Sequence, residues 1–248
     1  MRTANIPALS VSPVASVVEG ARRFAARNGL PTRDHWDYSR VVVTPDAVAK
    51  IGAAYMELPF IDNGAPAAWK AMREEVMRQL EFVTAPASRG GLGITVSVED
   101  ADPYDVTQPG GTRAFFDDVA NGRMRVLSTA VTGSHFFFSD DENDAFRAVH
   151  DIFGHCGTGR GVDRHGEEAA YRKHALMFSP LARKALATET RGQNHAMIAN
   201  GGEFQAQKVA ILPKWARDFE AVRPASMADY RAALKQAAKM HASQGLAG

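Results

Sequence analysis

Apolar residues recur along most of the chain at intervals of three and four, the spacing of one face of an α-helix. One such stripe has charged residues on its opposite side, and we expect it to face the core. Its members are Trp69, Met72, Val76, Leu80 and Val83. The pairs Thr44-Pro45 and Ser179-Pro180 are typical helix starts. We expect helices over about 14–28, 45–56, 69–83, 112–120, 162–177 and 180–199, a further one from the acidic cluster at 140–144, and a last one from Ser226.

Short runs rich in β-branched residues predict the strands. They lie at 40–44, 94–98 and 125–131. Helices outweigh them, so the predicted fold class is α+β, predominantly helical, with a small β component. We expect one domain over residues 1–248. It would have a helical N-terminal part (1–90, beginning with an irregular arm over 1–13), a central part (91–212) and a helical C-terminal part (213–248).

Composition excludes several classes of protein. The chain has 248 residues, of which 45% are hydrophobic and 23% charged, and these are ordinary globular values. A net charge of +1 gives no basic field that would favour nucleic acid or a membrane surface. A single cysteine, Cys156, excludes an internal disulfide framework and fits a reducing compartment. Pro7 and Pro13 interrupt any signal-like segment, and no apolar run is long enough to span a bilayer, so we expect a cytoplasmic protein.

The candidate chemistry centres on one stretch, Phe146 to Cys156, where His150 and His155 are five residues apart. Neutral imidazole is the commonest metal ligand in proteins, and two imidazoles with one carboxylate suit non-haem Fe(II). On a regular α-helix, positions five apart diverge by about 140°. The two histidines converge only if the helix ends or unwinds between them, for which Gly154 is the candidate. The alternative is a helix end with one buried and one exposed histidine.

A third ligand would come from a later helix. Glu189 is the first choice, because it shares a helix face with small and apolar residues, and a carboxylate buried there needs a partner or a metal. Glu203 is the second choice, and Glu167 and Glu168 come next.

Together these residues resemble a known family. The run His150-Asp-Ile-Phe-Gly-His-Cys156 is similar to the ligand motif of the iron- and tetrahydropterin-dependent aromatic amino acid hydroxylases, above all the bacterial phenylalanine hydroxylases. The upstream stretch Phe115-Phe116-Asp-Asp-Val-Ala-Asn121 and the two downstream helices follow in the family's order. The resemblance runs from Phe115 to about Gln193, roughly a third of the chain.

The resemblance implies an O2-dependent hydroxylase with a hydroxylase-like catalytic domain, Fe(II) and a tetrahydropterin such as tetrahydrobiopterin. The metal ligands it implies are His150, His155 and Glu189, with Asp151 as a further catalytic residue. The implied cofactor-binding residues are Gly111, Phe115, Phe116 and Asp151. The implied substrate-binding residues are His135, Phe138 and Phe153.

Three departures from the family change the expected substrate. Asp151 replaces the family's glutamate, and the Pro-Glu-Pro run before the motif is missing. His135 stands where the family has the arginine that binds the substrate's carboxylate. We therefore expect a small-molecule substrate other than a free aromatic amino acid.

Two other functions fit parts of the pattern. His150-Asp151 also looks like the dyad of HD-type phosphohydrolases, which would need His135 and Asp163 or Asp218 as further ligands. A non-catalytic relative of the fold would instead bind a small ligand, with Arg160 and Arg191 available for an anion. The ordinary interpretation of those arginines is a solvated surface pair.

Overall fold

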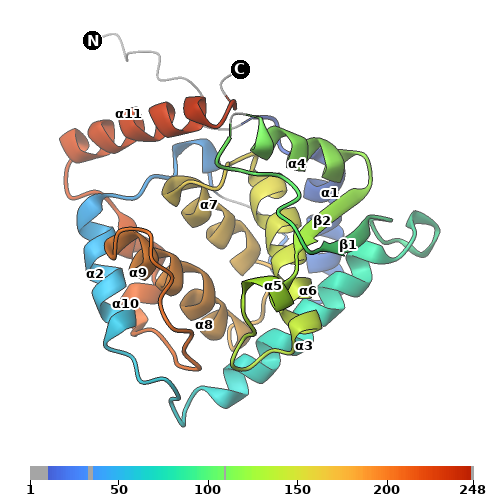
Figure 1. The fold of residues 1–248 in the computed structure, drawn as a ribbon, viewed down its shortest axis with the longest axis horizontal. Coiled ribbons are helices and arrows are strands. Elements are labelled where there is room, and N and C mark those ends of the chain that lie inside the picture. Colours follow the sequence, from blue (N-terminus) through green and yellow to red (C-terminus); the bar gives the residue numbers. More distant parts are fainter. Residues whose placement is uncertain (1–10, 33–35, 109, 247–248) are drawn as a thin grey trace.

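The computed structural model describes residues 11–32, 36–108 and 110–246, and it is predominantly helical with one small sheet (Figure 1). The predicted fold class, mostly helical α+β, is confirmed at that level. Most of the predicted arm, residues 1–10, lies outside the described residues. None of the described helices is both long and apolar enough to cross a membrane.

Every predicted helix is present, with boundaries shifted by a few residues. The helices are α1 (Ala15–Arg27), α2 (Pro45–Met56), α3 (Pro66–Thr84), α4 (Gly111–Ala120), α5 (Thr129–Thr132), α6 (Asp140–His150), α7 (Arg164–Ala175), α8 (Ala182–Ala187), α9 (Gln193–Ala199), α10 (Lys214–Arg217) and α11 (Met227–Ser243). Two π-helical turns continue α6 and join α8 to α9: η3 (Asp151–Cys156) and η4 (Thr188–Gly192). The described residues also include the short 3₁₀ turns η1 (Tyr38–Arg40), η2 (Ala87–Arg89) and η5 (Phe219–Val222).

Side-chain caps fix where several of these helices begin. Thr44 accepts a hydrogen bond from the Ala47 N–H at the start of α2, and Ser226 does the same for Asp229 in α11. At α6 the cap is Ser139, which forms a reciprocal capping box with Glu142. The acidic residues that follow Ser139 therefore occupy the first turn, where they complement the helix dipole.

The sheet has two parallel strands, β1 (Thr95–Glu99) and β2 (Arg123–Leu127), joined through α4. A helical crossover is the usual connection between parallel strands. The prediction for 125–131 ran too far, because the chain turns at Ser128 into the short helix α5. The predicted strand at 40–44 is not a strand: Val41, Val42 and Val43 are buried in an irregular segment. Their β-branched side chains serve the core there without pairing to a sheet.

The core holds the histidine-bearing helix between two others. Trp69, Met72 and Val76 of α3 are fully buried, as their stripe predicts, and α3 packs against α6 and α8. On the other side, α7 packs against η3 (Figure 1). Separate apolar clusters join α2 to α9 and pack α11 against Val42. Packing against α3 on one side and against α7 on the other therefore holds the end of α6 in place without a bound ligand.

Candidate metal centre

A π-helical turn brings the two histidines together. Helix α6 passes without a break into η3, whose wider turn is closed by hydrogen bonds between residues five apart. His150 and His155 consequently lie on the same side, with ring centroids 5.4 Å apart. The predicted unwinding at Gly154 takes this form, and the helix does not end there. Gly154 has a second role, since a Cβ at this position would lie 2.9 Å from the Cβ of Ala170 in α7.

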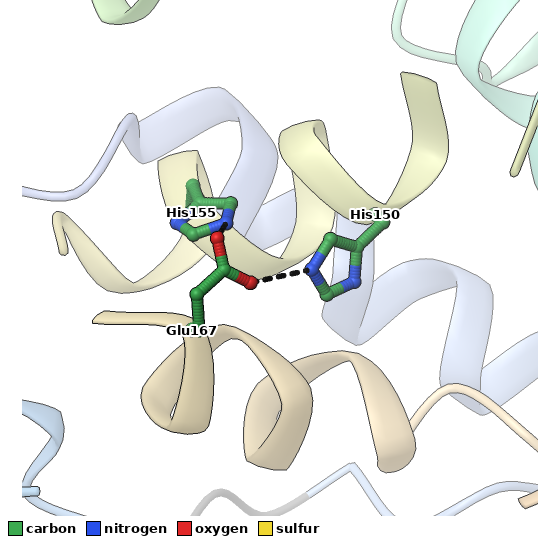
Figure 2. A group of neighbouring side chains, drawn as sticks. All are labelled: His150, His155 and Glu167. Carbon is green, nitrogen blue, oxygen red and sulfur yellow. Dashed lines mark ion pairs between the residues drawn. The ribbon is translucent and has the colours of Figure 1, made fainter. Parts of the chain in front are cut away.

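Glu167 of α7 completes the group (Figure 2). Asp163 caps α7 by accepting hydrogen bonds from the N–H groups of His165 and Gly166, so Glu167 lies in the first turn, which faces η3. Its Oε1 is 3.4 Å from His155 Nε2, and its Oε2 is 3.8 Å from His150 Nε2. The three ligand atoms lie within 4.8 Å of one another, close enough to surround one metal ion. Two imidazoles and one carboxylate are the donor set of mononuclear non-haem iron sites.

The proton on His155 is located by its backbone partner. Its Nδ1 lies 3.1 Å from the carbonyl oxygen of Arg160, which can only accept a hydrogen bond. The Nδ1 atom therefore carries a proton, so the ring in its neutral form has its lone pair on Nε2, the atom that faces Glu167. This is the tautomer that a metal requires.

Without a metal, the group behaves as an ion pair. Burial by itself lowers the pKa of His155, but the Glu167 carboxylate overcomes it and raises that pKa above the usual value. Burial raises the pKa of Glu167, but the positive charge of His155 outweighs this effect and brings that pKa below the usual range. The carboxylate is therefore ionised at neutral pH. A divalent cation bound here would replace the proton on His155, as expected for metal sites built on histidine.

A second layer of side chains lies behind His150. Its Nδ1 is 3.2 Å from Nδ1 of His174, and His174 Nε2 is 2.7 Å from Oε1 of Gln79. Burial, reinforced by the neighbouring histidines, lowers the pKa of His174 well below its usual value. His174 is thus neutral and has both a donor and an acceptor nitrogen to offer.

Glu189, the first choice for the third ligand, lies elsewhere. Its Oε2 is 3.3 Å from His135 Nε2, and its side chain is only 5% exposed. The backbone N–H groups of Phe137 and Phe138 donate to His135 Nδ1, so the proton of this ring is on Nε2 and faces Glu189. The partner that a buried carboxylate requires is therefore a histidine from a distant segment. The structure therefore places Glu167, and not Glu189, beside the two histidines.

The remaining candidates for the third ligand are engaged or exposed. Glu168 forms a buried ion-pair network with Arg172 and Arg191. Glu203 is exposed beyond the end of α9. One sequence feature favoured Glu167: the short connection after η3 makes α7 the spatial neighbour of the histidines, as short connections between helices do.

Most of the residues implied as cofactor-binding are enclosed by the fold. Phe115 and Phe116 are both buried in the core, and Phe115 meets the ring of His155 edge-on at 6.5 Å. At Gly111, a Cβ would lie 2.3 Å from two backbone carbonyl oxygens, so this glycine permits close packing of the chain. Asp151 is half-buried beside the histidines, and its burial raises the pKa of its carboxyl group.

The residues implied as substrate-binding form an aromatic layer behind the histidines. Phe138 stacks on His135 with ring centroids 4.7 Å apart, and Phe153 is fully buried between Phe24 and His174. Phe146 continues the layer to His150, at 5.9 Å. These rings form an apolar packing layer on one side of the site.

The residues needed by the two alternative functions have other partners. Asp163 and Asp218 accept hydrogen bonds from backbone N–H groups as caps of α7 and η5. Arg160 is buried and donates to the carbonyl oxygens of Tyr38 and Val41. Arg191 is buried in the network with Glu168, so neither arginine is the solvated surface residue expected from the sequence.

No protein-family model, curated protein or solved structure matches this chain.

Proposed function

We propose that the protein is a mononuclear non-haem Fe(II) hydroxylase that uses O2 to oxidise a small-molecule substrate, with His150, His155 and Glu167 as the iron ligands. The observation that carries the proposal is the convergence of these three side chains within 4.8 Å. The order of residues in the motif, from His150 to Cys156, supports the two histidines as ligands.

The three side chains divide the work of holding a cation. The histidines contribute neutral nitrogen donors, and the carboxylate of Glu167 offsets one positive charge. His155 is 1% exposed and Glu167 is 23% exposed, so the group opens toward solvent on the Glu167 side. When bound, iron would supply the redox chemistry with O2 that no side chain provides.

The reductant and the substrate follow from the resemblance and its departures. A tetrahydropterin is the reductant that the family motif implies, although Phe115 and Phe116 are too enclosed to stack on it. His135 replaces the arginine that would bind an amino acid carboxylate, and it is engaged by Glu189. This pairing supports a substrate other than a free aromatic amino acid.

A hydrolase is the second candidate, because two histidines and a glutamate also bind catalytic zinc. Asp151 favours this function, since a half-buried carboxyl group with a raised pKa beside a metal can serve as an acid or a base. The HD-type version has less support, because Asp163 and Asp218 act as helix caps.

Nitric oxide distinguishes the two candidates. It binds Fe(II) at an open coordination position and gives a high-spin EPR signal, so it reports whether the site can accept O2. We expect this signal from the anaerobic Fe(II)-loaded protein, and its loss in Glu167→Ala. Absence of the signal, together with hydrolysis of a model phosphoester in the presence of zinc, would contradict the hydroxylase and support the hydrolase.

A further inference from the structure

We propose that His174 and Gln79 are positioning residues that fix the tautomer of His150 and thereby direct its Nε2 lone pair at the metal position. The inference rests on the proposed metal site and adds two residues to it. Three helices contribute: His150 ends α6, His174 lies in α7 and Gln79 lies in α3. The three side chains form a hydrogen-bonded relay, which we call the Gln79 relay.

The direction of the Gln79 relay is set at its far end. The amide nitrogen of Gln79 donates to the backbone carbonyl oxygen of Met177, at 3.2 Å. A carbonyl oxygen cannot donate, so the amide must be oriented with its own oxygen, Oε1, toward His174. Oε1 lies 2.7 Å from His174 Nε2, and it can only accept. His174 therefore carries its proton on Nε2.

The direction of the hydrogen bonds continues from His174 to the ring of His150. A neutral imidazole with its proton on Nε2 has a lone pair on Nδ1. His174 Nδ1 is 3.2 Å from His150 Nδ1, so His150 must supply the proton between them. The lone pair of His150 is then on Nε2, the atom that faces Glu167. If the hydrogen bonds ran in the reverse direction, the side-chain oxygen of Gln79 would face the Met177 carbonyl oxygen. Two acceptors would then be in contact with no proton between them.

Burial leaves the Gln79 relay no substitute partner. Gln79 and His174 are both fully buried, and the ring of His174 is packed by Phe178 at 4.8 Å and by Phe153 at 6.3 Å. Buried polar groups without partners are destabilising, so each member holds the next in one orientation. The second histidine is fixed more simply, by the Arg160 carbonyl. The Nδ1 atom of each histidine thus has an acceptor inside the protein. For His155 it is the Arg160 carbonyl oxygen, and for His150 it is the Nδ1 atom of His174.

Two variants remove the Gln79 relay, and a third serves as a control. Gln79→Leu deletes the terminal acceptor, and His174→Phe replaces the ring without its nitrogens. Phe178→Leu disturbs the packing around His174 and leaves all the hydrogen bonds in place.

The test combines NMR of ¹⁵N-labelled histidine in the metal-free protein with Co(II) titration. We expect the proton of His150 on Nδ1 in the wild type, and a loss of that preference in Gln79→Leu. We expect Co(II) to bind about 10- to 100-fold more weakly to Gln79→Leu and His174→Phe, the usual effect of removing an outer partner of a metal ligand. Phe178→Leu should stay within about threefold of the wild type even where it lowers stability.

A purely structural role predicts something else. Gln79→Leu and His174→Phe would then lower stability without changing Co(II) affinity, or the wild-type His150 would carry its proton on Nε2, and either result would overturn the proposal. Failure of the hydroxylase proposal can be told apart from failure of the Gln79 relay. If the protein binds Co(II) tightly but gives no iron–nitrosyl signal, the hydroxylase proposal fails, and the Co(II) affinities of the variants still test the relay. If the wild type bound no Co(II), the tautomer found by NMR would decide alone.

Discussion

Two neighbouring glutamates of α7 have opposite roles. Glu167 faces the histidines, whereas Glu168 is fully buried against the guanidinium groups of Arg172 and Arg191. Against the desolvation that burial imposes, Arg191 and Arg172 keep the pKa of Glu168 below its usual value. The first residue is therefore positioned to bind a cation, and the second ties α7 to η4.

This division predicts different stabilities for two matched variants. Glu168→Gln should lower the free energy of unfolding by about 3–5 kcal/mol, because it leaves buried guanidinium charge without its counterion. Glu167→Gln should cost less, about 1–2 kcal/mol, because its side chain is partly exposed and His155 can release its proton once the carboxylate is gone. Urea unfolding in the presence of a chelator measures both. Equal losses, or a larger loss for Glu167→Gln, would contradict the assignment.

At the scale of elements, the candidate metal centre depends on η3. This turn brings His150 and His155 to the same side, and its backbone packs closely against α7 at Gly154. This close contact sets the distance between the histidines and Glu167. A small displacement of α7 therefore changes the site directly.

Two glycines of this segment provide a matched test. In Gly154→Ala the new Cβ would lie 2.9 Å from Ala170, so we expect a loss of about 1–3 kcal/mol and weaker Co(II) binding as α7 is displaced. In Gly157→Ala the nearest atoms lie at 3.6 Å and the backbone is already helical, so stability should be unchanged or slightly higher. Urea unfolding and Co(II) titration of both variants check this. Equal behaviour would contradict the close-contact role of Gly154.

The sequence alone predicts the helices and the pairing of the two histidines. It does not predict that Glu167 is the carboxylate that lies beside them. Apolar spacing locates α3, and the geometry of a regular helix shows that His150 and His155 need a local change between them. The small and apolar neighbours of Glu189 favour it as a ligand, and they correctly predict that it is buried. Its partner, His135, comes from a segment 54 positions earlier, and such long-range pairing is not encoded in local spacing.

At the scale of the whole molecule, the buried histidines make stability depend on pH. Burial lowers the pKa of four of them below the usual value: His165, to about 4, and His174, His195 and His241. Histidines in the unfolded chain have a pKa of about 6.5. Between the lowered pKa values of the folded protein and pH 6.5, the unfolded chain therefore binds more protons than the folded one. The pKa of His155 is instead raised, so this residue has the opposite effect above pH 6.5.

The metal-free protein should therefore be most stable near pH 6.5 to 7. Stability should fall as pH drops from about 6.5 toward 4, with His165 alone contributing on the order of 3 kcal/mol. It should also fall as pH rises through the folded-state pKa of His155, because the proton of the His155–Glu167 pair is lost. Urea unfolding in a chelator across this range measures both slopes. A stability that stays constant from pH 7 to 5 would contradict the neutral state assigned to the buried histidines.

The most direct test of the whole account is the affinity and stoichiometry of Fe(II), measured anaerobically for the wild type and four alanine variants. We expect one iron per chain in the wild type, and loss of binding in His150→Ala, His155→Ala and Glu167→Ala, whose side chains form the group. Glu189→Ala, which removes the partner of His135, should still bind iron. Iron that persists in Glu167→Ala and disappears in Glu189→Ala would contradict the assignment, and a wild type that binds no iron would refute the proposed function.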